Sequence, residues 1–294
     1  MYKVKTSSDP IEDAGLLVVR TVADLRRAVA GFRKAGRTIG LVPTMGALHE
    51  GHVSLVKGAL ERGDVPVTSI FVNPTQFGPK EDFSAYPRDE QGDFDKLRAA
   101  QCCIVFAPTK DEMYPGEQLT TVTVAGITDG LCGPLRPGHF QGVATVVSKL
   151  LLMAMPDRAY FGEKDYQQLQ VIKRMVRDLA MPFEIVGMPT VREPDGLAMS
   201  SRNRYMSAEE RTKALVMYRQ LVTVADTVRD GKKSCAEATA AASQALRDGG
   251  FDIVEYFTVV DAESLKPLDR VTGPARVIAA ARLGRTRLID NIAV

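Results

Sequence analysis

TIGLVPTMGALHEGH, residues 38–52, is the stretch of sequence that decides the fold. It opens with an apolar run over 38–42, which predicts a buried β-strand. Gly46 and Gly51 then allow a tight turn, and an amphipathic pattern over 52–62 predicts a helix. A buried strand that leads through a turn into a helix is the opening of a parallel α/β unit.

The same alternation continues on both sides of this stretch. Residues 1–19 are expected to form an irregular lead-in. Helices are predicted over 21–36, 89–100, 143–155 and 166–179, and strands over 65–72, 102–108, 158–161 and 183–186. Apolar strands separated by helices predict a parallel sheet covered on both faces. We therefore expect the α/β fold class, with a Rossmann-like doubly wound parallel sheet over residues 1–190 that lacks the dinucleotide fingerprint G-x-G-x-x-G.

The pattern changes after residue 190. Capping boxes at Ser207 and Ser234 open two helices, and strands are predicted over 255–261, 275–283 and 286–294. Helices followed by strands predict a second, smaller α+β domain. Residues 191–294 are expected to form it and to act as a lid or dimer-associated domain.

Composition excludes several classes of function. Net charge is +2, from 38 basic and 36 acidic residues, so no strong field exists for nucleic acid or an anionic membrane. The 4 cysteines lack CxxC spacing, which favours reduced thiols, and 3 histidines are few for a multi-histidine metal site. The N-terminal segment lacks the apolar core of a signal peptide, and the longest apolar run, 143–155, is too short to span a bilayer. We expect a cytoplasmic enzyme.

The first candidate site is the turn between strand 38–42 and the next helix. Backbone N–H groups and the positive helix end meet there, at the sheet edge where phosphates bind. His49 and His52 are three residues apart, so both imidazoles can face one pocket and donate to phosphoryl oxygens. The alternative is a pair of surface histidines at a helix start, but the two glycines and the strand–turn–helix context favour the phosphate site.

Polar residues also follow two further strands. Asn73 and Gln76, in NPTQFG, offer donors and acceptors for a small polar substrate, although the motif alone is typical of a turn. Lys164, in GEKDYQQ, is a natural partner for phosphate, and Gln168 shares its helix face. A capped helix start with a solvated lysine is the alternative there. Three strand ends that carry polar residues nevertheless indicate one functional rim.

Two loops are more ambiguous. Residues 191–203, VREPDGLAMSSRN, carry two hydroxyls and Arg202 on a glycine-containing loop, which suits a mobile clamp on a leaving pyrophosphate. A polar interdomain linker is the alternative. Arg136 and His139, in RPGHFQG, precede a helix and can reach the same rim, but loop structure explains them nearly as well.

The chain resembles the pantothenate synthetases, also called pantoate–β-alanine ligases, of the HxGH nucleotidyltransferase superfamily. The resemblance runs from about residue 20 to the last residue. It is carried, in the family's order and spacing, by PTMGALHEGH, SIFVNPTQFG, YPR, RPGHFQGV, FGEKDYQQL, VREPDGLAMSSRN and TRLIDNIAV. It implies a homodimer that joins pantoate to β-alanine with ATP, through a pantoyl-adenylate and with release of AMP and pyrophosphate.

The resemblance also implies roles for individual residues. ATP is expected to contact Met45, Gly46, Ala47, Leu48, His49, Glu50, Gly51, His52, Gly162, Glu163, Lys164, Asp165, Val191, Met199, Ser200, Ser201 and Arg202. Pantoate is expected at Gln76 and Gln168, with Asn73, Arg136 and His139 as further substrate-binding candidates. The negative charge that grows in the transition state is expected to be neutralised by His52, His49, Lys164, Arg202 and a magnesium ion, and His52 matches the proton-donor position. Another HxGH-type adenylyltransferase and a non-catalytic nucleotide sensor remain alternatives.

The expected magnesium site departs from the family pattern. Asp93 matches an acidic position associated with Mg²⁺. Cys132 stands four residues before Arg136, where the family carries glutamate. Magnesium prefers oxygen ligands, so a thiol there would weaken the metal site. The alternative is that Cys132 packs as a small apolar residue away from any metal.

Overall fold

The computed structural model describes residues 15–79, 81–231 and 233–294. It divides into two compact units, each of which combines separate stretches of the chain. Unit 1 contains the residues up to Thr123 together with Gln141–Phe161 and Met175–Met188, and unit 2 contains Val124–Phe140, Gly162–Arg174 and Pro189–Val294. The predicted domain boundary at residue 190, and the lid role of the segment beyond it, stay predictions.

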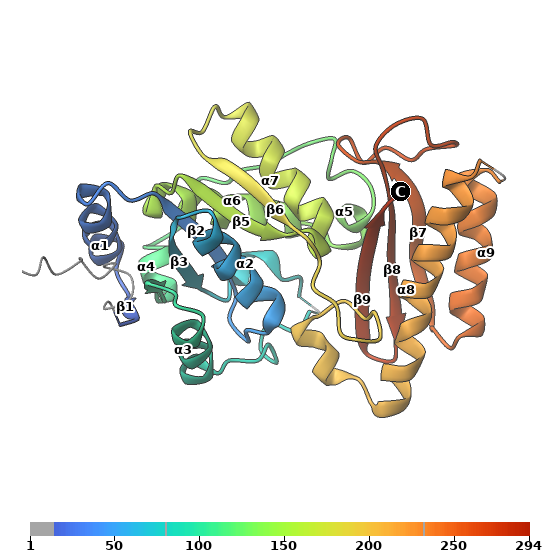
Figure 1. Cartoon of the computed structure of the whole chain (residues 1–294), viewed down its shortest axis with the longest axis horizontal. Helices are drawn as coiled ribbons and strands as arrows, with labels where there is room; N and C mark the ends of the chain where they lie inside the picture. Colours follow the sequence, from blue (N-terminus) through green and yellow to red (C-terminus); the bar gives the residue numbers. More distant parts are fainter. Residues whose placement is uncertain (1–14, 80, 232) are drawn as a thin grey trace, which may run out of the picture. The chain divides into compact units, whose positions relative to one another are not determined.

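Unit 1 is built on a six-stranded sheet in the order β1-β4-β3-β2-β5-β6 (Figure 1). The strands are β1 (Leu17–Val19), β2 (Ile39–Thr44), β3 (Val65–Ile70), β4 (Ile104–Phe106), β5 (Arg158–Gly162) and β6 (Glu184–Met188). The pairs β1–β4, β4–β3, β3–β2 and β2–β5 are all parallel. The helices along this part of the chain are α1 (Val22–Lys34), α2 (Glu50–Glu61), α3 (Glu90–Ala99), α4 (Lys110–Met113), α6 (His139–Ala154) and α7 (Tyr166–Asp178).

Helices cover both faces of this sheet. Right-handed crossovers place α2 and α3 on one face, because the chain moves in one direction across the sheet from β2 to β4, and α1 and α6 on the other. Val56 of α2 and Leu97 of α3 share one buried cluster with Val42 of β2. On the opposite face, Arg33 of α1 donates to the carbonyl of Met155, just beyond α6, at 2.6 Å. The predicted doubly wound α/β fold is confirmed.

The strand order reverses between β2 and β5. These strands are neighbours, with Gly40 opposite Arg158 and Leu41 opposite Ala159. The chain leaves β2 towards α2 and leaves β5 towards α7, and the crossovers run in opposite directions across the sheet. The carboxyl ends of β2 and β5 therefore form a topological switch point, the usual place for ligands in such sheets.

The sequence prediction was wrong at the start of the described chain. Residues 17–19 form β1, which pairs with β4 from Leu17 opposite Ile104 to Val19 opposite Phe106. A three-residue strand is too short to show a periodic pattern, so the pairing with β4 decides its conformation.

Among the described residues, no helix has the length and apolar character needed to cross a membrane.

Unit 2 contains an antiparallel sheet of β7 (Ile253–Asp261), β8 (Ala275–Leu283) and β9 (Thr286–Ala293). Helices α8 (Ala208–Arg229) and α9 (Cys235–Asp248) run side by side along one face of it (Figure 1). The predicted capping boxes at Ser207 and Ser234 open both helices. Alternate residues of β8, among them Val277 and Ala279, join the core under these helices. The predicted smaller α+β part is confirmed.

Candidate active site

The turn after β2 begins α2 with a histidine cap. His49 is the N-cap residue, and its Nδ1 accepts a hydrogen bond from the backbone N–H of Gly51 at 3.1 Å. Nδ1 of His52 accepts from the backbone N–H of His49 at 3.3 Å. The two imidazole rings lie 4.2 Å apart between their centroids. The two histidines therefore accept hydrogen bonds from backbone N–H groups at the start of α2, and their rings lie next to each other.

These hydrogen bonds fix the tautomer of both rings. A ring nitrogen that accepts a hydrogen bond carries no proton, so each neutral imidazole must carry its proton on Nε2. Both side chains are half-buried. His49 and His52 are thus held as Nε2–H donors at a helix N-terminus, where negative charge is favoured. Such an arrangement can stabilise a phosphoryl oxygen.

The side chain of Asp93 stabilises this turn through hydrogen bonds to its backbone. Ala47 lies in the left-handed region, with φ 51°, and the Asp93 carboxylate accepts from its backbone N–H at 2.8 Å and from that of Leu48 at 2.7 Å. Gly46 is also left-handed, with φ 79°, and a Cβ there would lie 2.9 Å from Asp93 Oδ2. Burial raises the pKa of Asp93, although the two N–H groups oppose the rise. Asp93 is therefore placed to hold the turn.

In the described part of the chain, Asp93 is already bound to backbone groups at the predicted magnesium site. Asp93 is 1% exposed, and both carboxylate oxygens bind backbone N–H groups. Nowhere in the described part of the chain do three or more His, Cys, Asp or Glu side chains gather as metal ligands do. Magnesium usually keeps several waters and is held by only one or two carboxylates together with substrate phosphates. Asp93 holds the turn in this structure, and its contact with magnesium stays a prediction.

Asn73 and Gln76 follow β3 as predicted, but their roles differ. Asn73 is 1% exposed; its amide nitrogen donates to Gln76 Oε1 at 3.1 Å and to a backbone carbonyl, and its oxygen accepts from Tyr114 at 2.8 Å and from Thr75 at 3.0 Å. These contacts use its full hydrogen-bonding capacity. Asn73 orients Gln76, whose amide lies 3.2 Å from the sulfur of Met45, and its contact with substrate stays a prediction.

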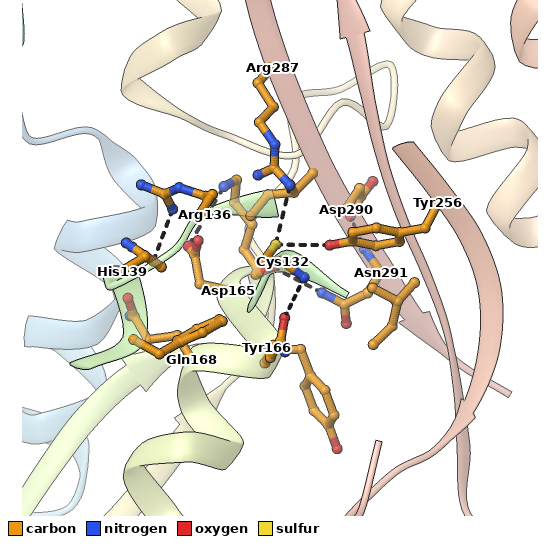
Figure 2. Close-up of a pocket in the computed structure, with 15 residues that line it drawn as sticks. Cys132, Arg136, His139, Asp165, Tyr166, Gln168, Tyr256, Arg287, Asp290 and Asn291 are labelled. Atoms are coloured by element: carbon orange, nitrogen blue, oxygen red, sulfur yellow. Dashed lines mark hydrogen bonds and ion pairs between the residues drawn. The ribbon is translucent and has the colours of Figure 1, made fainter. Parts of the chain in front are cut away.

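Unit 2 contains a pocket that many of the remaining predicted residues line (Figure 2). Predicted residues in its wall are Arg136, His139, Lys164, Asp165 and Gln168. Arg136 donates to Nε2 of His139 at 2.9 Å, because a guanidinium has no acceptor. Gln168 also lines the pocket, four residues along the chain from Lys164.

Positive charge dominates around Asp165 in this pocket. The carboxylate lies 3.6 Å from the ammonium of Lys164. Burial disfavours its charged form, but Lys164 and Arg202 outweigh that cost and hold the pKa of Asp165 below its usual value. A region that stabilises one carboxylate in this way can also stabilise a phosphate or carboxylate of a substrate.

Cys132 lies in the same pocket, 8% exposed and in a cluster with Phe140 and Val171. Its sulfur is 3.0 Å from the hydroxyl of Tyr256 and 3.2 Å from the guanidinium of Arg287 (Figure 2). A second cation is disfavoured beside a guanidinium. The geometry therefore favours the alternative in which Cys132 packs away from a metal.

The loop over 191–203 is an anchored hairpin at its base. Met199 donates to the carbonyl of Val191 at 3.0 Å. Gly196 has φ +98°, and a Cβ there would lie 2.3 Å from the ring of Tyr218, so this turn requires glycine. Ser200 caps the short helix η3 (Ser201–Tyr205), which contains Arg202. The predicted closure of this loop on a triphosphate stays a prediction.

The sequence analysis did not identify a set of polar residues that hold segments of the predicted site in place. These residues are Arg192, Arg276, Asp290 and Asn291, which contact the hairpin and the turn after β5. They lie in motifs that the sequence singled out, VREPDG and TRLIDNIAV, or on the strand between them. Their hydrogen bonds join residues far apart in the chain, which no local pattern reveals.

The fold and these sites define the class of protein: a Rossmann-like α/β protein with a histidine-capped turn at the switch point of its sheet. The family model described as pantoate-beta-alanine ligase matches residues 17–293. The chain belongs to the pantoate–β-alanine ligase family and is, like its members, an enzyme.

Relatives support this assignment along almost the whole chain. A pantothenate synthetase from Paramagnetospirillum magneticum is 57% identical over 277 residues, which are 94% of this chain and 97% of the relative. The crystal structure of pantothenate synthetase from Thermus thermophilus is similar with a TM-score of 0.88 and 50% identity, covering 94% of this chain and 98% of that one. A Francisella tularensis pantoate-beta-alanine ligase, solved in complex with beta-gamma ATP and beta-alanine, has a TM-score of 0.78 and 33% identity, covering 94% and 97% of the two chains.

Proposed function

We propose that this enzyme condenses pantoate with β-alanine at the expense of ATP, through a pantoyl-adenylate, and releases AMP and pyrophosphate. The observation that carries the proposal is the turn after β2, where two imidazoles are held as Nε2–H donors at a helix N-terminus. The Francisella tularensis relative was solved with beta-gamma ATP and beta-alanine, two of the compounds that the proposed reaction uses.

The reaction has two displacements. A carboxylate oxygen of pantoate attacks the α-phosphorus of ATP, and the bond to pyrophosphate breaks. The amine of β-alanine then attacks the acyl carbon, the carbon–oxygen bond to AMP breaks, and the amine nitrogen loses its extra proton. Neither step needs a nucleophile from the protein, so catalysis consists of positioning the reactants and neutralising negative charge.

Individual residues are assigned to this chemistry as follows. His49 and His52 donate Nε2–H groups to phosphoryl oxygens, and His52 is the proton donor. Lys164 and Arg202 supply positive charge, consistent with their effect on the pKa of Asp165. The remaining proposed contacts with ATP are Met45, Gly46, Ala47, Leu48, Glu50, Gly51, Gly162, Glu163, Asp165, Val191, Met199, Ser200 and Ser201.

Pantoate is assigned to Gln76 and Gln168. Asn73 orients Gln76, and Gln168 lines the pocket shown in Figure 2. Arg136 and His139 line the same pocket and are proposed to help hold the pantoate carboxylate.

Exchange of labelled pyrophosphate into ATP tests the proposal. Exchange that requires pantoate, and proceeds without β-alanine, supports the adenylate. Exchange that requires a different carboxylate instead would identify another adenylyltransferase. Binding of ATP without exchange under any of these conditions would identify a nucleotide sensor and overturn the proposal.

We also propose that the protein is a cytoplasmic homodimer, on the family resemblance. Sedimentation equilibrium should give a mass twice that of the 32.0 kDa chain. A mass equal to that of one chain across the working concentration range would contradict the homodimer.

A further inference from the structure

Two adjacent residues of β9 contact two different segments of the proposed ATP site. Successive residues of a strand point to opposite faces of the sheet. Asp290 binds Arg192 in the hairpin over 191–199, and Asn291 binds the turn at Glu163 that follows β5. Both side chains are buried, at 4% and 3% exposure. All these residues belong to unit 2.

The contacts of Asn291 use its whole amide group. Its nitrogen donates to the carbonyls of Glu163 at 2.9 Å and Lys164 at 3.0 Å. Its oxygen accepts from Arg276, whose guanidinium also pairs with the Glu163 carboxylate at 2.6 Å and lies 3.9 Å over the ring of Tyr166. Asn291 therefore fixes the backbone from which Lys164 projects.

The contacts of Asp290 fix the hairpin in a similar way. Its carboxylate accepts two hydrogen bonds from Arg192, at 2.6 Å and 2.9 Å. The same guanidinium donates to the carbonyls of Gly196 at 3.0 Å and Asn291 at 3.2 Å, and lies 4.1 Å over the ring of Tyr218. A planar guanidinium with a two-pronged carboxylate partner is a rigid connection. Asp290 thus holds the base of the hairpin that leads to Arg202.

We propose that Asp290 and Asn291 are positioning residues for the ATP reaction: Asn291 places Lys164, and Asp290, through Arg192, places the hairpin that leads to Arg202. The inference rests on the proposed function of those two cationic residues. Asp290 and Asn291 act indirectly, through the segments that they hold, because their side chains are hydrogen-bonded to other protein groups. A displacement of about 1 Å in a group that neutralises transition-state charge can cost on the order of 100-fold in rate.

The two residues should give different kinetic effects. Asn291→Asp keeps the shape of the side chain but removes both donors and places a carboxylate against two carbonyl oxygens. It should lower kcat for pantoate-dependent adenylation by about 10- to 100-fold, with a smaller change in KM for ATP. Asp290→Asn removes the negative charge that pairs with Arg192, so it should raise KM for ATP by about tenfold and change kcat less.

Ile292→Ala is the matched control on the same strand. Ile292 packs against the core under α8 and α9. It should lower the melting temperature while leaving kcat and KM for ATP as in the wild type. If Asn291→Asp does not fold, Asn291→Ser, which keeps one donor and adds no charge, provides the same comparison.

A double-mutant cycle tests the connection through Arg192. Arg192→Gln should reproduce the KM effect of Asp290→Asn, and the double variant should be no worse than either single one. If the Asp290 and Asn291 variants melt earlier but keep wild-type kcat and KM, as the control does, the positioning role is wrong. A wild-type protein without any pantoate-dependent exchange would instead overturn the proposed function, and the two failures are therefore distinguishable.

Discussion

Substitutions of His49 can separate its two roles, as a helix cap and as a hydrogen-bond donor. Nδ1 accepts from the backbone N–H of Gly51, whereas the proton on Nε2 is assigned to the reaction. Asparagine carries an acceptor where histidine has Nδ1, and glutamine carries an amide nitrogen near the position of Nε2. His49→Asn therefore keeps the cap and loses the donor, and His49→Gln does the reverse.

The expected magnitudes follow from these contacts. Loss of a helix cap costs about 1 kcal/mol, which corresponds to a melting temperature lower by about 2–4 °C. Loss of one transition-state donor costs on the order of 10²–10³ in rate. His49→Asn should melt like the wild type but adenylate pantoate about 10²- to 10³-fold more slowly, because it loses one transition-state donor. His49→Gln should melt earlier and adenylate faster than His49→Ala.

Thermal melting by circular dichroism and pyrophosphate exchange at saturating ATP and pantoate measure the two effects. The equivalent changes at His52, whose Nδ1 accepts from the backbone N–H of His49, provide an independent repeat. If His49→Asn exchanged pyrophosphate at the wild-type rate, the imidazole would be a cap alone, and its catalytic assignment would be lost.

Three further predictions concern other parts of the site. Lys164→Ala should slow adenylation at saturating ATP, while Gln168→Ala should mainly raise the pantoate concentration needed; an ATP effect alone for Gln168→Ala would contradict its assignment. Asp93→Ala leaves two buried N–H groups without an acceptor, so it should destabilise the protein by about 2 kcal/mol, measured by urea unfolding, with no change in the magnesium midpoint of the remaining activity; a shifted midpoint would restore its metal role. Cys132→Glu should pair with Arg287 and leave the magnesium midpoint of adenylation unchanged; a lower midpoint would show that position 132 reaches the metal.

Much of the fold was predictable because its signals are local. The apolar run over 38–42, the turn glycines and the capping boxes at Ser207 and Ser234 each depend on residues close in sequence. The turn after β2 was found for the same reason. Residues 17–19 were missed because only their pairing with β4 makes them a strand.

The residues that hold the site segments through long-range hydrogen bonds could not be predicted in this way. Asp93 accepts from a backbone N–H 46 residues away, at Ala47, and Asn291 donates to a carbonyl 127 residues away, at Lys164. Hydrogen bonds from side chains to distant backbone groups leave no periodic signal in either segment. A carboxylate that holds a turn and a carboxylate that binds a metal look alike in sequence, which is why Asp93 was assigned to magnesium.

Transfer of ¹⁸O from labelled pantoate tests the adenylate directly. When the pantoate carboxylate carries ¹⁸O in both positions, attack on the α-phosphorus places one labelled oxygen in the bridge, and attack by β-alanine then leaves that oxygen on AMP. Mass spectrometry of the products should therefore show AMP with one ¹⁸O and pyrophosphate with none. Unlabelled AMP, or label in pyrophosphate or orthophosphate, would show that the carboxylate does not attack the α-phosphorus, and would contradict the mechanism.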